Sequence, residues 1–108
     1  MLYKKVNSST FDISFCEITI YLSEISSNIA SKFIADFEQQ SNTLLELPFL
    51  YPVYEHDKRF RKMIMADFNY CVFYIVEKDK IIFIDILHQS QNLSSILVNK
   101  FPKQNCPD

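Results

Sequence analysis

Residues Arg59–Asn92 read RFRKMIMADFNYCVFYIVEKDKIIFIDILHQSQN, and this stretch decides the fold. It contains three runs rich in β-branched and aromatic residues: RKMIMA (61–66), YCVFYIV (70–76) and KIIFIDILH (80–88). Short polar breaks at 67–69 and 77–80 separate the runs. Because these breaks leave room only for tight turns, the stretch predicts three consecutive strands in an antiparallel meander.

The residues before this stretch predict a short strand followed by a helix. A first strand is expected at Leu2–Val6, and a cluster of helix-capping residues follows at 7–10. Residues 11–25 fit an apolar helical stripe, but they also alternate as strand residues do. We favour the helix because the run is long, contains no turn and starts at the capping cluster.

A second helix is expected from about Ser26 onward, with apolar residues at helical spacing until Pro48 stops it. Segment 48–57 contains two prolines, so it cannot be helical throughout, and it is too aromatic for a free linker. It is expected to wrap the core and lead into the sheet. The apolar residues after Asn92 indicate a short terminal helix or strand.

These patterns predict an α+β domain, with a helical hairpin packed on an antiparallel sheet. The expected element order is β-α-α-β-β-β with a short C-terminal element. Residues 1–101 are expected to form this single domain, and residues 102–108 a disordered tail.

Both faces of the predicted sheet are apolar. Pairing the strands through their turns places on one face Phe73, Ile75, Ile82, Ile84 and Ile86. The other face would carry Val72, Tyr74, Ile81, Phe83 and Leu87. Since the hairpin covers one face, the other needs the C-terminal segment, a partner chain or a second copy to cover it. The alternative is that residues 48–57 and 93–101 cover this face entirely.

Composition excludes several classes of site. The 108 residues include no glycine, so a glycine-rich phosphate-binding loop is excluded. Three widely spaced cysteines and two histidines argue against a zinc site or a disulfide framework, and no cofactor is expected. No apolar run has the length of a membrane helix, so we expect no membrane association and a location in the reducing cytoplasm.

Charge argues against non-specific binding of nucleic acid, because the net charge is −2. The cations are nevertheless concentrated near the start of the meander, where Arg59 and Arg61, the only arginines, precede Lys62. In a regular strand, Arg59 and Arg61 would share one face and Lys62 would take the other. These three residues could contact phosphates or an acidic partner, or they could form a solvated strand end bridging to Glu55 or Asp57.

Several motifs in order resemble toxins of the RelE/ParE superfamily, the toxic halves of bacterial type II toxin–antitoxin pairs. They are the approach LLELPFLYP, the basic strand RFRKMI, the aromatic strand YCVFY and the Ile-rich strand IIFIDILHQSQN, with a weaker match at IASKF. The resemblance spans most of the chain. It implies a growth-inhibiting toxin that is neutralised by a cognate antitoxin.

Two positions place the chain nearer the ParE-like branch, whose members bind DNA gyrase, than the ribonuclease branch. Cys71 stands where ribonuclease members carry an arginine that steadies the scissile phosphate, and thiols cannot supply that charge. Gln91 stands where an arginine is common after the Leu87-His88 ending. The chain is therefore expected to be a gyrase-binding toxin rather than an enzyme.

Two alternatives remain. The first is a ribosome-dependent mRNA endonuclease, for which the catalytic candidates are Arg59, Arg61, Lys62 and His88. The second is a non-toxic module that only binds the antitoxin. His88 could act as a general acid or base, although a hydrogen-bonded structural histidine is the favoured interpretation.

The residues expected to bind the target or the antitoxin combine the basic strand with one sheet face. They are Arg59, Arg61, Lys62, Phe73, Ile75, Ile82 and Ile84. The expected partners are an antitoxin and gyrase, with the ribosome and its mRNA as the alternative target. A homodimer is a further alternative for the second apolar face.

Overall fold

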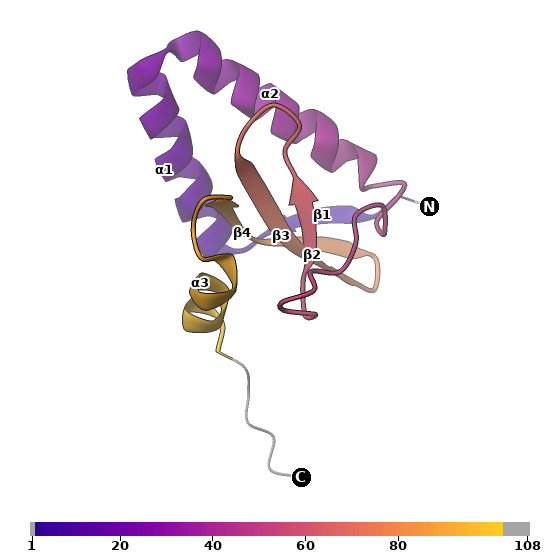
Figure 1. The fold of residues 1–108 in the computed structure, drawn as a ribbon. Helices are drawn as coiled ribbons and strands as arrows, with labels where there is room; N and C mark the ends of the chain where they lie inside the picture. Colours follow the sequence, from indigo (N-terminus) through magenta and orange to yellow (C-terminus); the bar gives the residue numbers. More distant parts are fainter. Residues whose placement is uncertain (1, 103–108) are drawn as a thin grey trace.

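The computed structural model describes residues 2–102 as an α+β fold, in agreement with the predicted class (Figure 1). The elements, in order, are β1 (Lys4–Asn7), α1 (Ser9–Ile25), α2 (Ser27–Thr43), β2 (Arg61–Ile64), β3 (Tyr70–Glu77), β4 (Lys80–His88) and α3 (Leu93–Lys100). The short C-terminal element is thus a helix. The predicted tail at 102–108 lies, beyond Pro102, outside the described residues.

Two serines define the helical hairpin. Ser8 caps α1, and its Oγ accepts a 3.0 Å hydrogen bond from the backbone N–H of Phe11. Ser26 ends α1 and also caps α2, accepting from the N–H of Ile29 at 3.4 Å. Residues 11–25 are therefore helical, as we favoured, and α2 ends at Thr43, before Pro48 is reached.

The four strands lie in the order β1-β4-β3-β2. β2, β3 and β4 form the predicted antiparallel meander. β1 pairs in parallel with β4, so the complete sheet is mixed. β2 and β1 are consequently the two edges of the sheet.

A register shift between β3 and β4 corrects the predicted faces of the sheet. Phe73 lies opposite Asp85 but Tyr74 lies opposite Phe83, so Ile84 is an extra residue on β4. Such a bulge reverses the facing of every later residue in the strand. Ile86 therefore packs with the core under the hairpin and Leu87 with the core on the opposite side, the reverse of the prediction.

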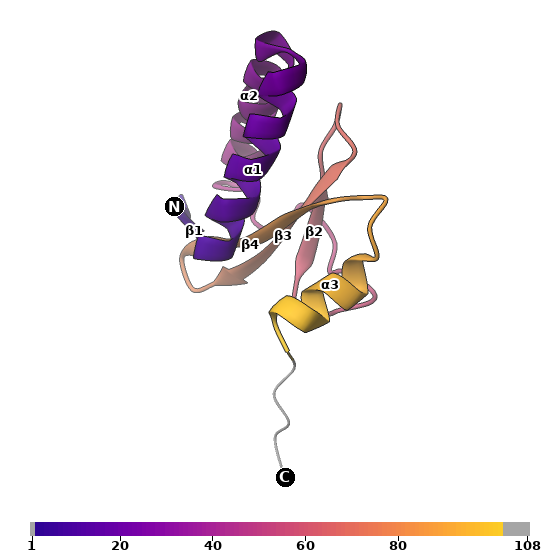
Figure 2. The same ribbon diagram turned by 90° about the vertical axis from the view of Figure 1, so that its left-hand side faces the viewer.

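The sheet separates two apolar cores. The larger core lies between the sheet and the α1–α2 hairpin and includes Phe11, Phe33, Phe37, Tyr74 and Phe83. The smaller core lies on the other face, where α3 packs (Figure 2). We call the surface under the hairpin the first face and the surface under α3 the second face.

The segment between α2 and β2 wraps the sheet as predicted. The buried Tyr74 hydroxyl donates a hydrogen bond of 3.2 Å to the carbonyl of Pro48. Val53 then forms a β-bridge with Arg61, and the N–H of Tyr54 donates to the carbonyl of Phe60 at 2.8 Å. The segment thereby extends the β2 edge and places Tyr54 on the second face.

Candidate functional site

Arg59 lies in the turn before β2 and is held by Asp57. Its Nε and Nη2 donate to the two carboxylate oxygens of Asp57 at 2.9 and 2.6 Å, and its guanidinium lies 4.8 Å from the centre of the Phe60 ring. The hydrogen bond to Asp57 is the main cause that raises the pKa of Arg59 above its ordinary value. Arg59 therefore forms the bridge to Asp57 that was one of the two predicted roles of these basic residues.

Arg61 and Lys62 point to opposite faces of the sheet. Arg61 Nη1 donates to the carbonyl of Tyr51 at 2.9 Å, and its guanidinium lies 4.8 Å from the Phe49 ring centre. Lys62 lies on the second face, with Nζ 5.4 Å from the centre of the Tyr54 ring. Because β2 begins only at Arg61, the regular strand that would align Arg59 with Arg61 does not form.

His88 ends β4 and organises the turn that leads to α3. Its Nδ1 lies 2.6 Å from Ser90 Oγ and accepts a 3.1 Å hydrogen bond from the N–H of Ser90. The ring meets Tyr70 edge-on, with 5.1 Å between the ring centres, and the His88 N–H donates to the Gln91 side-chain oxygen. These contacts favour the structural interpretation of His88.

The nuclease candidates do not converge on one site. Arg61 pairs with Tyr74 and His88 pairs with Tyr70, on the two strands that flank β3. This places the two backbones about 13 Å apart along the sheet and about 10 Å apart across it. Cys71 is fully buried on the second face, where burial is the main cause that raises the pKa of its thiol to about 11.

The second face is covered at one end only. α3 and residues 54–60 bury Cys71, Phe73 and Leu87, and Phe73 contacts Tyr54 with 5.2 Å between the ring centres. Phe73, which was expected to contact a partner, is therefore a core residue with no exposed surface. Ile75, Ile82 and Ile84 remain half-buried.

The uncovered end of the second face is a continuous apolar surface. Val6, Ile82 and Ile75 are register neighbours across three strands, and Ile84 follows on β4. We call Val6, Ile75, Ile82 and Ile84 the open patch. Lys4 and Lys80 are also register neighbours, and both are exposed at the end of the patch.

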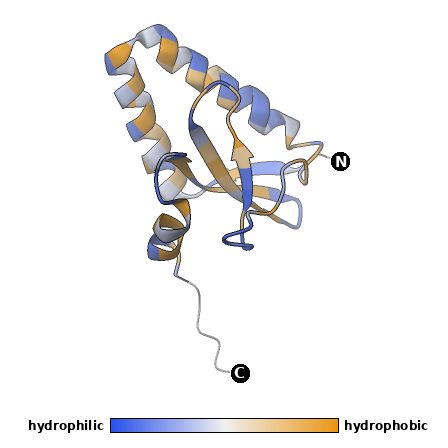
Figure 3. Cartoon of the chain, in the orientation of Figure 1, coloured by the Kyte–Doolittle hydropathy of each residue, from blue (hydrophilic) through white to orange (hydrophobic). Residues whose placement is uncertain are grey.

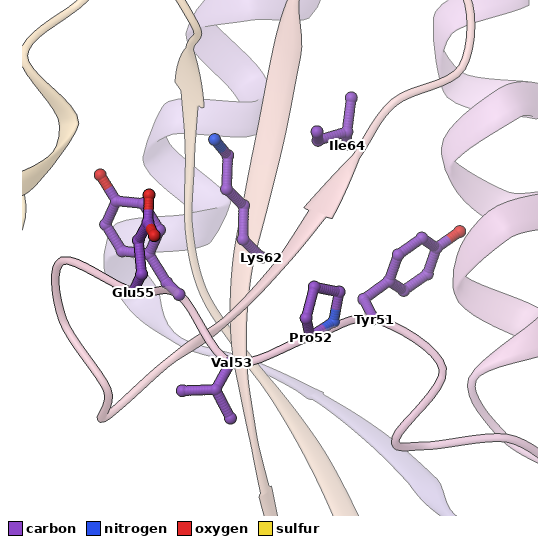
Figure 4. Close-up of a pocket in the computed structure, with 7 residues that line it drawn as sticks. Tyr51, Pro52, Val53, Glu55, Lys62 and Ile64 are labelled. Carbon is purple, nitrogen blue, oxygen red and sulfur yellow. The ribbon is translucent and has the colours of Figure 1, made fainter.

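A pocket at the β2 edge, of about 510 Å³, was not anticipated from the sequence (Figure 4). Its lining is Tyr51, Pro52, Val53, Tyr54, Glu55, Lys62 and Ile64. In Figure 4 Lys62 projects from β2 toward the Glu55 side of the pocket, and Tyr51 points to the opposite side. The one sequence signal for this pocket is the density of aromatic residues in PFLYPVYEHD, because large apolar side chains in a loop usually pack against the body of the protein.

Comparison with known proteins identifies the family. Residues 20–93 match the ParE toxin of the type II toxin–antitoxin system parDE. The chain belongs to the ParE toxin family. This result confirms the RelE/ParE resemblance and its ParE-like branch, and the family implies a cognate antitoxin as partner. No curated protein sequence matches the chain.

Solved structures agree on the fold. A chain of the chromosomal ParDE toxin–antitoxin system from P. aeruginosa superposes with a TM-score of 0.69 at 14% identity, covering 81% of this chain and 96% of that one. The solution structure of a conserved hypothetical protein from Helicobacter pylori gives 0.57 at 18% identity, covering 84% of this chain and 98% of that one. At these identities the likeness concerns the fold alone.

The ParE-family domain has no helix, within residues 2–102, that is long and apolar enough to cross a membrane. Within the same residues no three His, Cys, Asp or Glu side chains are grouped to hold a metal ion. Three surface features of residues 2–102 are candidates for a functional role: the open patch, the pocket at the β2 edge and the faces of the hairpin.

Proposed function

We propose that this ParE-family toxin arrests growth by binding a protein target in the cytoplasm, DNA gyrase, and not by cutting RNA. The observation that carries the proposal is that both arginines are engaged inside the molecule. Arg59 holds Asp57, and Arg61 holds the Tyr51 carbonyl and stacks on Phe49. Gyrase is the target that the ParE-like branch implies.

Phosphodiester cleavage needs a preorganised cation and a proton-transfer group at one scissile bond. His88 is about 13 Å along the sheet from Arg61, and its Nδ1 is occupied by Ser90. Burial raises the pKa of the thiol at position 71 to about 11, so it is even further from ionising near pH 7 than an ordinary thiol. An RNA-cutting mechanism would therefore require residues that are fixed on paired strands of the sheet to come together.

The open patch is the surface that we assign to the antitoxin. Its isoleucines are only half-buried, so a partner that covers them removes apolar area from water. Lys4 and Lys80 at its end, and Lys62 elsewhere on the same face, favour acidic side chains in that partner. The antitoxin segment we expect is thus amphipathic and acidic.

The mechanism is tested by expressing the toxin without its antitoxin. We expect growth to stop, purified gyrase to lose supercoiling activity in the presence of the toxin, and translated mRNA to remain uncut in a ribosome assay. Codon-positioned cleavage of mRNA with unimpaired gyrase would replace this proposal with the endonuclease alternative. Antitoxin binding without any effect on growth would instead identify a non-toxic regulatory module. The net charge of −2 is compatible with that alternative, because such a module would not have to bind nucleic acid.

The antitoxin surface is tested with Ile82→Lys and Ile75→Lys. Each should weaken the complex with the co-purified antitoxin by about tenfold to a hundredfold, as loss of a central apolar contact does. Ile34→Lys, an exposed isoleucine of α2 on the other side of the sheet, is the matched control and should bind normally. Wild-type affinity in both patch variants would reject this surface, and a dimer that Ile82→Lys dissociates would assign it to a second copy.

A further inference from the structure

The outer face of α1 is apolar, although a surface helix is expected to be polar there. Four large apolar side chains of this one helix are more than half exposed: Ile13 (61%), Ile20 (54%), Tyr21 (57%) and Ile25 (59%). At 3.6 residues per turn, Ile13 and Ile20 lie opposite the buried Phe11 and Leu22. Figure 3 shows that hydrophobic residues recur along the length of α1, and these four are the ones that the exposure places on its outer side.

Acidic residues are interleaved with these apolar side chains. Glu17 and Glu24 are exposed and fall, by helical periodicity, between Ile20 and Tyr21 around the helix. α1 also contains Asp12 and has no lysine or arginine. None of the ion pairs among residues 2–102 involves these three carboxylates. We call Ile13, Glu17, Ile20, Tyr21, Glu24 and Ile25 the α1 band.

A second copy of the chain is a poor occupant for the α1 band. Two α1 helices that pack antiparallel through Ile13 and Ile20 would meet at the midpoint between these residues, beside Glu17. The two-fold axis would then bring Glu17 of one copy against Glu17 of the other, and like charges at a helix contact are unfavourable. The charge pattern calls instead for a partner with basic side chains around an apolar stripe.

We propose that the α1 band is a docking surface for a cationic amphipathic helix of a partner protein. Leucine-like side chains of that helix pack on Ile13, Ile20 and Tyr21, and its lysines or arginines lie beside Glu17 and Glu24. The band is on the hairpin, which covers the first face, whereas the open patch is on the second face (Figure 2). The interaction is therefore independent of the antitoxin surface proposed above.

Two defined peptides test the proposal directly. One is a fluorescent helical peptide of about 20 residues with leucine at heptad positions a and d and lysine at e and g, and the other has glutamate in place of lysine. Fluorescence anisotropy with the full chain should give a Kd of about 10 µM or tighter for the lysine peptide and much weaker binding for the glutamate peptide. Affinity for the lysine peptide should fall as salt is added.

Variants then locate the binding site. Ile13→Ser and Ile20→Ser should each weaken binding by about tenfold, whereas Ile34→Ser on α2 should not. Glu17→Gln combined with Glu24→Gln should remove most of the salt dependence, and Glu46→Gln combined with Glu77→Gln, at two exposed carboxylates outside α1, is its charge-matched control. Ile82→Lys should leave peptide binding unchanged, so that failure here and failure of the antitoxin surface are distinguished. Circular dichroism verifies that each variant is folded.

Cys16 provides an independent readout because it is an exposed residue of α1. The measurement uses a Cys106→Ser variant, so that Cys106 does not react with the alkylating reagent. In this variant a saturating concentration of the lysine peptide should slow alkylation of Cys16 about tenfold, because the bound peptide covers the thiol most of the time. Equal binding of both peptides, unchanged affinity in Ile13→Ser and Ile20→Ser, or unchanged alkylation of Cys16 would each overturn the proposal. Self-association of the chain that Ile20→Ser abolishes would also overturn it, in favour of a second copy.

Discussion

Lys100, in the last turn of α3, donates a 2.9 Å hydrogen bond to the carboxylate of Asp85, whose side chain is fully buried in β4. The N–H of Ile86 donates to the other carboxylate oxygen at 2.9 Å. α3 is otherwise held to the second face by apolar contacts. The Lys100–Asp85 ion pair therefore adds an electrostatic contact to the apolar packing of α3 on the sheet.

Lys100→Ala should lower the free energy of unfolding by about 1–2 kcal/mol, because it leaves a buried carboxylate with one donor fewer. This loss is smaller than the loss expected for a fully buried ion pair, because the Lys100 side chain is 40% exposed and water screens part of the interaction. Urea unfolding provides the measurement. Asn99→Ala, at an exposed position of the same helix, should change stability by less than about 0.5 kcal/mol. Equal stability of the two variants would show that the pair contributes nothing.

Arg59→Ala should destabilise the turn before β2, because Asp57 loses two charged hydrogen bonds while its side chain is only 1% exposed. Arg59 itself is 35% exposed, so the expected loss is about 1–2 kcal/mol. Arg59→Lys should recover only part of it, since lysine cannot form the two-pronged contact. Growth arrest by these variants should follow their folded fraction. Lys58→Ala, the exposed neighbour, is the control.

Abolished toxicity in a fully stable Arg59→Ala protein would contradict the structural role of Arg59. It would indicate that the guanidinium leaves Asp57 to contact the target. The two outcomes are separated by measuring growth arrest and urea unfolding on the same variant.

Periodicity and capping residues were sufficient to predict the hairpin and the three-stranded meander. Residues 11–25 fitted both helix and strand, and the capping cluster that contains Ser8 was part of the argument for the helix. The sequence did not indicate that β1 pairs in parallel with β4, because a four-residue strand carries no signal for its neighbour or direction. Strand direction is set by the tertiary path of the hairpin.

The sites were harder to predict because they depend on contacts between distant residues. Ile86 and Leu87 were assigned to the wrong faces, since the extra residue at Ile84 leaves no mark in an alternating Ile-rich run. The Asp85–Lys100 pair spans 15 residues and two elements, so no local spacing indicates it. By contrast, the Arg59–Asp57 bridge joins residues two positions apart, and the sequence predicts it as one of two roles for the basic residues at 59–62.

The buried thiol of Cys71 should make stability depend on pH in the alkaline range. Burial is the first cause that raises its pKa to about 11 from 9.0, so the folded state holds the thiol proton more tightly than the unfolded state does. Between about pH 9 and pH 11 the unfolded chain loses this proton first, and the free energy of unfolding therefore falls as pH rises.

Cys71→Ala should show a shallower fall over the same pH range, in urea unfolding measured at each pH. Tyr70 and Tyr74, whose pKa values are raised mainly by burial, titrate in both proteins and cancel in the comparison. The pKa of Tyr54 is raised first by burial and next by the charge of Cys71, so its smaller contribution to the alkaline slope also decreases in Cys71→Ala. Cys16→Ala, which removes an exposed thiol, should keep the wild-type slope. Identical slopes for all three proteins would mean that the thiol at position 71 titrates normally.

His88 provides the last prediction, because its structural and catalytic interpretations have opposite signatures. A histidine that accepts a hydrogen bond from the Ser90 N–H and packs on Tyr70 supports the turn into α3. His88→Gln should then cost about 1 kcal/mol in urea unfolding, with growth arrest following the folded fraction. His56→Gln, at a histidine whose side chain is 62% exposed, should have no effect.

Ser90→Ala gives a second test of the same histidine, because Ser90 Oγ lies 2.6 Å from His88 Nδ1. If the contact stabilises the turn, the double variant should lose less stability than the sum of the two single variants, by about 0.5 kcal/mol or more. A general acid or base would instead show no such coupling in stability, while its loss would reduce RNA cleavage by about a hundredfold. A stable His88→Gln protein that still binds its antitoxin but no longer arrests growth would overturn the structural interpretation and return His88 to the functional site.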